Sequence, residues 1–299
     1  MSSPDDTFPH NFLSTSPAHG VAGHRFLYAG PLRSPTPILL ELPVPRHSGP
    51  AVAAENELRE ERYANYVWNA SVVLADKVAE CEIDVKGRKV LELGCGLGLP
   101  SIVAARMGAQ QVVLTDYDDP AGLQDTRRAV EEALASPLRE RCVVVGHTWG
   151  ESIAPILQAL PSYELVLVAD CVWDRSLHGP LIQTLRTLLE SSPGAVVHFS
   201  SGFHTGRGTV AEFLARAARA GVMPLVPSEW YELSVEGEVR AWEWRRVGGF
   251  WFSSSFSTDS KRSCGSSTPP AWRLGFGDEE RQEERNRWTL YGTLGLLEE

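Results

Sequence analysis

The stretch Val90-Leu91-Glu92-Leu93-Gly94-Cys95-Gly96-Leu97-Gly98-Leu99-Pro100 decides the fold class of this chain. Its apolar residues predict a strand over 89–93, its glycines predict a tight turn, and the residues after them predict a helix over 99–107. A second apolar strand, 111–115, runs into Asp116. A strand, a glycine turn, a helix and a second strand that ends in an acid are typical of nucleoside-binding α/β domains.

The spacing of the glycines narrows the class of ligand. A dinucleotide-binding turn needs a third glycine three residues after the second, and that position holds Leu99. Here the glycines alternate at 94, 96 and 98, and Glu92 precedes them. A carboxylate at this place suits a ligand that carries an ammonium group better than a pyrophosphate. A dinucleotide-dependent dehydrogenase is therefore disfavoured, while a glycine-rich turn without a ligand stays open as an alternative.

Composition excludes several classes of protein. The chain has 299 residues, 43% of them hydrophobic, and a net charge of −10, so it can form one or two domains and is a poor general nucleic-acid binder. We see no secretory signal and no apolar run long enough to cross a membrane. The five cysteines never stand in C-x-x-C spacing, which indicates reduced thiols, no metal site, and a location in the cytoplasm or nucleus.

Strands and helices alternate through the middle of the chain, which predicts a mostly parallel sheet with helices on both faces. Before the glycine turn, apolar residues at helical spacing predict a helix over 64–81. After Asp116 the pattern predicts helices over 121–135, 178–190 and 208–220, and strands over 142–146, 164–169 and 195–200.

Both ends of the chain differ in amino-acid composition from its middle. Residues 1–24 are rich in Ser, Pro and His and predict a disordered tail, and 25–47 predict a β-hairpin or extended arm. A polar loop follows over 48–60. We therefore divide the chain into a tail and arm, 1–60, and a main domain, 61–299, with a disordered insertion at about 253–287.

Four further sequence blocks stand in a fixed order around the glycine turn. They are Tyr66-Val67-Trp68-Asn69-Ala70-Ser71, Thr115-Asp116-Tyr117, His147-Thr148-Trp149-Gly150 and Ala169-Asp170-Cys171-Val172-Trp173. Together with the turn, they resemble the class I S-adenosylmethionine-dependent methyltransferases of the methyltransferase-16 group. The closest resemblance is to a fungal branch once described as nicotinamide N-methyltransferase-like, which includes elongation factor 1-alpha N-terminal and lysine methyltransferases. The match covers residues 60–235 and the last strand.

This resemblance implies a fold and a cofactor. The fold is a Rossmann-like, seven-stranded α/β sheet whose sixth strand lies in the region 222–235 and whose seventh, 287–295, inserts antiparallel. The cofactor is S-adenosyl-L-methionine, with Asp116 on the ribose hydroxyls and Trp149 on the adenine. For Asp116 a capping role is the alternative, and for the tryptophans core packing. The implied cofactor-binding residues are Trp68, Glu92, Gly94, Cys95, Gly96, Asp116, Tyr117, Trp149 and Ala169.

Two residues are the candidates for orienting the target amine, Asp170 and Trp173. The family pattern is usually D-x-x-Y or D-x-x-F, so Trp173 keeps the aromatic face, which favours a cation, but lacks the phenol hydroxyl. The loop Gly202-Phe203-His204-Thr205-Gly206-Arg207 also resembles the fungal branch. Within it, Arg207 could hold a carboxylate or carbonyl and His204 could take a proton. A plain strand-to-helix loop is an equal alternative.

We weigh three functions. The first is N-methylation of a lysine or N-terminal amine of a protein, with a translation elongation factor as one candidate substrate. The second is N-methylation of a small, nicotinamide-like amine, which a pocket sealed by residues 25–47 would favour. The third is a non-catalytic module that only binds the cofactor. In the first case we expect a monomer in the cytoplasm or nucleus, with no membrane or nucleic-acid partner.

Overall fold

The computed structural model describes residues 18–21, 23–30, 37–43, 66–234, 237–242, 244–247, 250–253 and 286–296. The expectations for the first 17 residues, for the loop over 48–60 and for nearly all of the insertion over 253–287 lie outside these ranges. Among the described helices, none combines the length and the apolar character that crossing a lipid bilayer requires.

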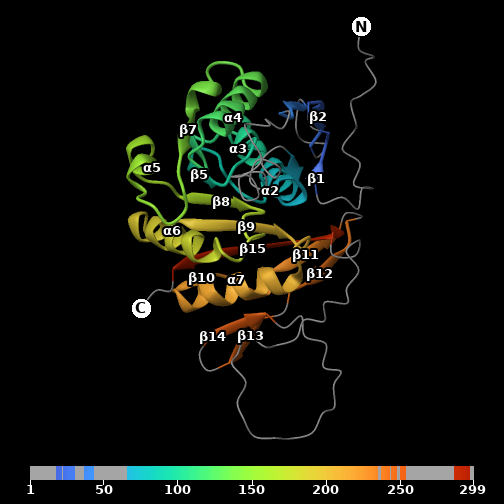
Figure 1. The fold of residues 1–299 in the computed structure, drawn as a ribbon, viewed down its shortest axis with the longest axis vertical. Coiled ribbons are helices and arrows are strands. Elements are labelled where there is room, and N and C mark those ends of the chain that lie inside the picture. Colours follow the sequence, from blue (N-terminus) through green and yellow to red (C-terminus); the bar gives the residue numbers. More distant parts are fainter. Residues whose placement is uncertain are drawn as a thin grey trace, which may run out of the picture.

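A central sheet organises the described part of the chain (Figure 1). This sheet has nine described strands, not the seven that the resemblance implies, in the order β12-β11-β15-β9-β8-β5-β6-β7, with β10 paired to β15. Strands β5 to β9 are parallel, whereas β15 runs antiparallel to β9, which confirms the predicted mostly parallel sheet with an antiparallel last strand. The bounds are β5 (Lys89–Leu93), β6 (Gln111–Asp116), β7 (Cys142–Gly146), β8 (Leu165–Ala169), β9 (Val196–Gly202), β10 (Val222–Pro224), β11 (Tyr231–Ser234), β12 (Val239–Ala241) and β15 (Trp288–Leu296).

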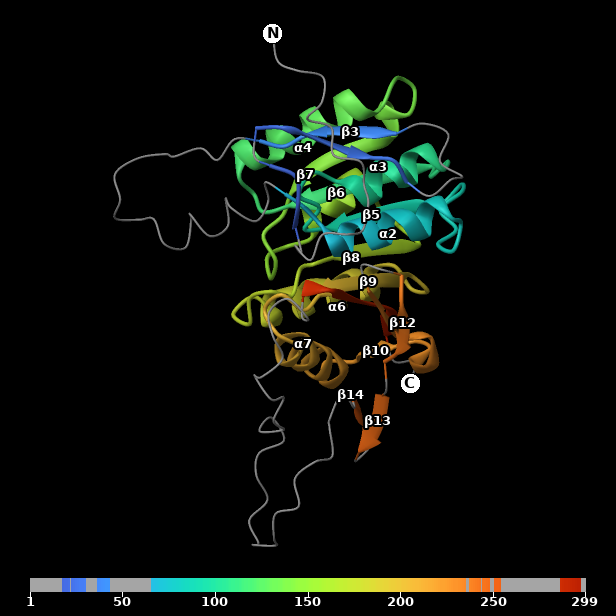
Figure 2. The same cartoon turned by 90° about the vertical axis from the view of Figure 1, so that its right-hand side faces the viewer.

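Helices cover both faces of this sheet, as predicted (Figures 1 and 2). One buried cluster joins the sheet to α2 (Asn69–Ala79), α3 (Leu99–Arg106) and α4 (Pro120–Ala133). A second buried cluster, on the other face, joins it to α5 (Ala154–Ala159), α6 (His178–Ser191) and α7 (Arg207–Arg219). The sequence pattern did not predict the short helix α5.

The strand order contains a topological switch point beside β5. Strand β5 pairs with β6 on one side and with β8 on the other, so the chain winds outward in both directions from β5. Ligands of open α/β sheets bind at the carboxyl ends of the strands beside such a switch point. The glycine turn, Asp116, Asp170 and Gly202 all lie at these carboxyl ends.

The first helix begins later than predicted. Helix α2 begins at Asn69 rather than at residue 64, because Val67 and Trp68 form a short strand, β4, that pairs with β1 (Ala18–His19). The prediction of a disordered tail is therefore wrong at Ala18 and His19. Their backbone pairs with β4, and the His19 ring hydrogen-bonds to the Asn69 side chain.

The predicted hairpin is present as β2 (Arg25–Tyr28) and β3 (Ile38–Glu41). Its inward side chains belong to the same buried cluster as α2, α3 and α4, and the Tyr28 hydroxyl donates to Asp76 Oδ1 of α2 at 2.6 Å. Because these side chains are buried in the core, the hairpin is a part of that core. The domain boundary at residue 60 stays a prediction.

The sixth strand region is interrupted. Strands β10 and β11 both pair with β15, but a single helical turn (Pro227–Glu229) separates them. Pro224 and Pro227 supply no backbone N–H, so a continuous strand over 222–235 would lack ladder hydrogen bonds. Further along, β13 (Trp244–Val247) and β14 (Phe250–Ser253) form a hairpin that contacts α7, which the sequence pattern did not predict.

Candidate cofactor and substrate site

Two positions of the glycine turn after β5, Gly94 and Gly98, require a residue without a side chain. Gly94 and Gly98 adopt positive φ angles of 62° and 72°, a region that other residues rarely occupy. A Cβ on Gly94 would lie 2.7 Å from Cys171 Sγ and 2.9 Å from Trp149 Cζ2. A Cβ on Gly98 would lie 2.4 Å from Leu114 Cδ2, so this glycine lets α3 pack closely on the sheet.

Glu92 is a buried acid with an unused acceptor. Its Oε2 accepts hydrogen bonds from the backbone N–H of Ser101, at 3.1 Å, and from the Ser101 hydroxyl. Its Oε1 is also buried and has no hydrogen-bond partner among the described residues. Burial raises the pKa of Glu92 from 4.5 to about 8. A buried acceptor without a donor, two residues before the glycine turn, fits the ammonium group of S-adenosylmethionine.

Asp116 lies directly beside the turn, at the end of β6. Its Oδ2 accepts from the Gly96 N–H at 2.6 Å, and its Oδ1 accepts from the Tyr117 N–H at 2.8 Å. Burial raises the pKa of Asp116, and these two backbone donors partly oppose that rise. A carboxylate has about four acceptor sites, so two remain for the hydroxyls of a ribose diol.

The other predicted cofactor-binding residues differ in how far they are exposed to solvent. Trp149 is half-buried and packs against the position where Gly94 lacks a Cβ. Tyr117 is 55% exposed, at the rim. Cys95 and Ala169 are buried. Burial raises the pKa of the Cys95 thiol well above its usual range, so the side chain is neutral and only the backbone of this residue is polar.

Asp170 begins a second part of the site, at the end of β8. Its φ angle is 57°, a left-handed conformation that Asp tolerates better than most residues. Its N–H donates to the Ser200 carbonyl at 2.9 Å, and its Oδ1 accepts from the Gly202 N–H at 3.0 Å. Burial raises the pKa of Asp170, while His204 and the Gly202 N–H oppose that rise. Trp173 is half-buried in the turn that follows.

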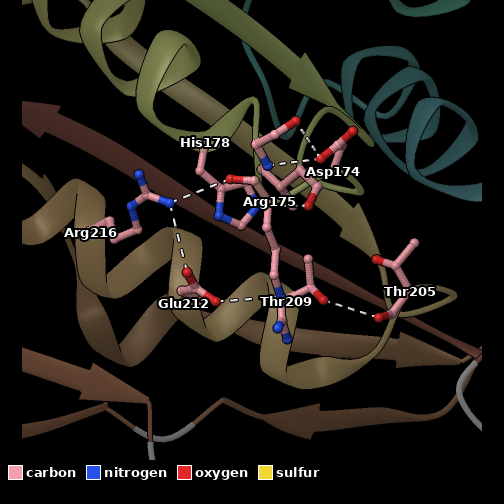
Figure 3. A network of polar contacts seen from close by, with 9 residues as sticks. Asp174, Arg175, His178, Thr205, Thr209, Glu212 and Arg216 are labelled. Carbon is pink, nitrogen blue, oxygen red and sulfur yellow. Dashed lines mark hydrogen bonds and ion pairs between the residues drawn. The ribbon is translucent and has the colours of Figure 1, made fainter. Parts of the chain in front are cut away.

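A polar network joins this turn to helix α7 (Figure 3). Arg175 Nε lies 3.4 Å from Glu212 Oε2, and Arg216 Nη1 donates to the Arg175 carbonyl at 3.4 Å. At the start of α7, the Thr209 hydroxyl donates to the Thr205 carbonyl at 3.0 Å. The same helix therefore contacts both loops that flank Asp170.

Arg207 packs against the protein's own residues. Its Nη1 donates to Glu232 Oε1, and its guanidinium lies 4.0 Å from the centre of the Phe203 ring. Glu232 is buried and also accepts from Arg240 Nε. These contacts favour the structural alternative for Arg207 over a role in holding a substrate carboxylate.

Three site features escaped the sequence analysis. They are the Ser101 donors to Glu92, the Gly202 donor to Asp170, and the stacking of Trp68 on His204, with ring centres 4.8 Å apart and an interplanar angle of 27°. The only sequence signal for the Gly202 donor and for the position of His204 is that the loop 202–207 follows a predicted strand next to β8.

The residues present fit S-adenosylmethionine, because the turn excludes side chains at Gly94 and acids with remaining acceptor capacity lie on both sides of it. The sheet order and this site define a class I S-adenosylmethionine-dependent methyltransferase. Residues 47–214 match the sequence profile described as lysine methyltransferase, and the chain belongs to that family.

Two curated relatives carry the same name, protein N-terminal and lysine N-methyltransferase EFM7. The one from Cryptococcus neoformans is 31% identical over 76% of this chain and 77% of its own length. The one from Schizosaccharomyces pombe is 34% identical over 46% of this chain and 54% of its own length. A solved S-adenosylmethionine-dependent methyltransferase from Geobacter sulfurreducens has a TM-score of 0.38 and 16% identity over 53% of this chain and 65% of that one.

Proposed function

We propose that this chain transfers a methyl group from S-adenosylmethionine to a primary amine of a protein, either a lysine side chain or an N-terminal α-amine. The observation that carries the proposal is Asp170. This buried carboxylate lies at the end of β8, beside the glycine turn, and its backbone is held by Ser200 and its Oδ1 by Gly202. A fixed acid next to the cofactor turn can bind and orient an ammonium group. The name of the Cryptococcus relative supports the same substrate class.

The cofactor part of the proposal assigns one role to each group. Glu92 Oε1 accepts from the ammonium group, Asp116 accepts from the ribose hydroxyls, and the Trp149 indole stacks on the adenine. S-adenosylmethionine, when bound, supplies an electrophilic methyl group on a sulfonium whose leaving group is neutral. The further proposed contacts come from the backbone of the turn and from its rim: Trp68, Gly94, Cys95, Gly96, Tyr117 and Ala169.

The chain's own residues then have to position the amine. Asp170 Oδ2 carries no hydrogen bond from a described residue and can accept from the amine, which holds the nitrogen close to the transferred methyl group. Trp173 supplies an aromatic wall, over which a cation is stabilised by about 0.5–2 kcal/mol. Because the leaving group is neutral, positioning supplies most of the rate enhancement.

The alternatives receive less support. A sealed small-molecule pocket was expected if residues 25–47 capped the site, but their hairpin contributes its inward side chains to the core beside α2. A non-catalytic module would have no use for an oriented acid at Asp170. We further propose that the enzyme acts as a monomer in the cytoplasm or nucleus, and a translation elongation factor is the first candidate substrate.

Two measurements test this function. Calorimetric titration with S-adenosylmethionine and S-adenosylhomocysteine, with NAD as the control, should show saturable binding of the first two only. A tritiated methyl group should then enter acid-precipitable protein of a fungal extract that keeps its small molecules and is fractionated by size after the reaction. Label that enters only the low-molecular-weight fraction would favour the small-molecule function. Binding without any transfer would favour the non-catalytic module.

Cofactor binding should release a proton from Glu92. The pKa of this buried acid is about 8, so at neutral pH it is largely protonated, and an ammonium group at Oε1 favours the ionised form. Calorimetry with S-adenosylhomocysteine at neutral pH, in buffers of different ionisation enthalpy, should show release of close to one proton. Apparent affinity should rise with pH up to about 8. Glu92→Gln keeps the size of the side chain and should abolish the release. An unchanged release in that variant would remove Glu92 from the ligand contacts.

The same pKa has a consequence for stability. The unfolded chain holds Glu92 at its ordinary pKa of 4.5, whereas the folded chain holds it at about 8, so the folded state binds the proton more tightly. The free energy of unfolding of the ligand-free protein should therefore decrease as the pH rises from 4.5 to about 8. Glu92→Gln should flatten this decrease in a urea titration.

Trp173→Ala should slow methyl transfer more than it weakens cofactor binding. Loss of the aromatic wall should lower kcat/KM for the protein substrate about tenfold, the size of a cation–π contribution. Trp173→Phe retains an aromatic face and should keep most of the activity. Steady-state kinetics, with S-adenosylhomocysteine affinity measured alongside, checks this. Equal activity of Trp173→Ala and the wild type would place Trp173 outside the site.

A further inference from the structure

Three side chains from separate elements meet beside the glycine turn. The Trp68 ring, at the start of α2, stacks on the His204 ring, in the loop after β9. His204 Nδ1 in turn faces Asp170 Oδ2 at 3.8 Å. Both partners of this pair are nearly buried, with 10% of the His204 side chain and 6% of the Asp170 side chain exposed. An imidazole is thus held between an indole face and a carboxylate.

The register of β8 and β9 brings Asp170 and His204 together. Ala169 pairs with Ser200, and the Gly202 N–H fixes Asp170 Oδ1, which leaves Oδ2 toward the histidine. Gly202 is the residue that leaves room for this approach. A Cβ there would lie 3.2 Å from His204 Nδ1 and 3.6 Å from Asp170 Oδ1.

His204 differs from the other buried or half-buried histidines of the described ranges. The rings of His19, His147, His178 and His198 each form a hydrogen bond, to Asn69, Thr184, Val172 and Tyr291 respectively. His204 Nδ1 is buried without a partner among the described residues. His178 Nδ1 is likewise buried without a partner, but its Nε2 contacts the Val172 carbonyl, whereas the His204 ring forms no hydrogen bond with a described residue. A tenth of the His204 side chain is exposed, and because Nδ1 is buried, the exposed part lies elsewhere on that side chain. Histidines with a structural role usually satisfy their ring nitrogens.

The proposed reaction needs a side chain that accepts a proton from the target amine. A lysine amine has a pKa near about 10.4 and an α-amine near about 8, so a target amine arrives largely protonated, and only its neutral form can attack a methyl group. Asp170 can bind the ammonium ion through its charge, and transfer of the proton to Asp170 would remove that charge. An imidazole is the side chain best suited to accept a proton near neutral pH.

We propose that His204 is a catalytic residue that accepts the proton of the target ammonium group, an inference that rests on the proposed function. The N–H bond of the ammonium breaks, its electron pair stays on the amine nitrogen, and the proton binds the accessible nitrogen of the imidazole. The imidazolium formed is stabilised by Asp170, toward which its Nδ1 points, and Trp68 holds the plane of the ring. The proton then leaves to water at the exposed part of the side chain. Separations of 3.8 Å are common in ligand-free sites and shorten when substrate binds.

The test compares two variants at two pH values. His204→Asn removes the proton acceptor, and His204→Phe removes it but keeps a ring stacked on Trp68. Initial rates of tritiated methyl transfer into dialysed fungal protein, at saturating cofactor, should fall about 100-fold in both variants at about pH 7. At about pH 9.5 the loss should shrink below about tenfold, because the amine loses its proton to solvent unaided. His24→Asn, an exposed histidine, is the matched control.

The outcomes separate this inference from the proposed function. No labelling of protein by the wild type at either pH would contradict the proposed function itself. Wild-type labelling with an equal loss at both pH values, or a near-normal rate for His204→Phe at the lower pH, would overturn the role of His204 alone. S-adenosylhomocysteine affinity should stay within about twofold of the wild type in His204→Phe, because this variant keeps a ring stacked on Trp68, a proposed cofactor contact.

Gly202→Ala provides a second, independent variant. The added methyl group would lie 3.2 Å from His204 Nδ1, which would have to shift by a few tenths of an ångström, and in ordinary contact with Asp170 Oδ1, while both functional groups remain in the chain. Gly202 has no positive φ angle, so the backbone accepts alanine without conformational strain. We expect the same pH-dependent loss as for His204→Asn. A normal rate at neutral pH, with the chain folded, would show that the contact between His204 and Asp170 is not used.

Discussion

Asp170→Asn should reduce methyl transfer about 1000-fold while leaving the affinity for S-adenosylhomocysteine within about twofold. The substitution changes the charge and little else. Asparagine, like aspartate, tolerates the left-handed conformation at φ 57°, and its amide oxygen can still accept from the Gly202 N–H. What it loses is the negative charge, which binds the ammonium group of the substrate and faces His204. Initial rates and calorimetry on the same preparation measure the two effects.

Asp174→Asn is the matched control for this experiment. Asp174 lies four residues further along the same turn, where its carboxylate accepts from the Ser176 N–H and hydroxyl at 2.8 and 2.7 Å. The same chemical change at this position should leave methyl transfer within a few-fold of the wild type. If the two variants lost activity equally, the loss would come from a disturbed turn, and the charge of Asp170 would not be what matters.

Gly94→Ala should abolish measurable cofactor binding and lower the free energy of unfolding by about 2–4 kcal/mol. Two costs combine. An alanine at φ 62° is strained by about 1–2 kcal/mol, and its Cβ would also lie 2.7 Å from Cys171 Sγ and 2.9 Å from Trp149 Cζ2. Relief of those contacts moves the turn or the Trp149 ring, which are the surfaces proposed to contact the cofactor. Urea unfolding and calorimetry check both parts.

Gly87→Ala separates the two costs. Gly87 has a comparable φ angle of 73°, but no atom lies within 4 Å of the position its Cβ would take. This variant should show the backbone cost of about 1–2 kcal/mol and normal cofactor affinity. A Gly94→Ala protein that still bound S-adenosylhomocysteine with wild-type affinity would contradict the assignment of the turn to the cofactor.

Local pattern was sufficient to predict the parallel strands β5 to β9. Strands such as β5 and β8 are buried on both faces and are read as short apolar runs, and the glycines mark the turn whatever lies around it. The start of α2 could not be predicted in this way. Trp68 and Val67 are extended because they pair with Ala18 and His19, far away in the sequence, and no helical spacing reveals that partner.

In the site, too, some features could be predicted from the local sequence and others depend on partners far away in the sequence. Asp116 and Asp170 each directly follow a predicted strand, and Glu92 is the last residue but one of another, so their meeting at one edge of the sheet could be expected. Arg207 could not be assigned, because its partner Glu232 comes from β11, beyond a whole helix. The environment of His204 likewise depends on Trp68, which reaches it from the other end of the domain sequence. The sequence shows which polar side chains lie at the ends of strands. Which of them are held by contacts with other side chains depends on tertiary packing.

The position of β15 also affects how the chain is made. This strand lies between β9 and β11, yet α7, β10 to β14 and the segment after them are all synthesised before it. Until Trp288–Leu296 leaves the ribosome, the outer edge of β9, whose end carries Gly202, lacks its partner. Unpaired apolar edges recruit other chains. A nascent chain that stalls before residue 288 therefore exposes the edge of β9 to pairing with other chains, and the sheet beside Gly202 is complete only after β15 has been added.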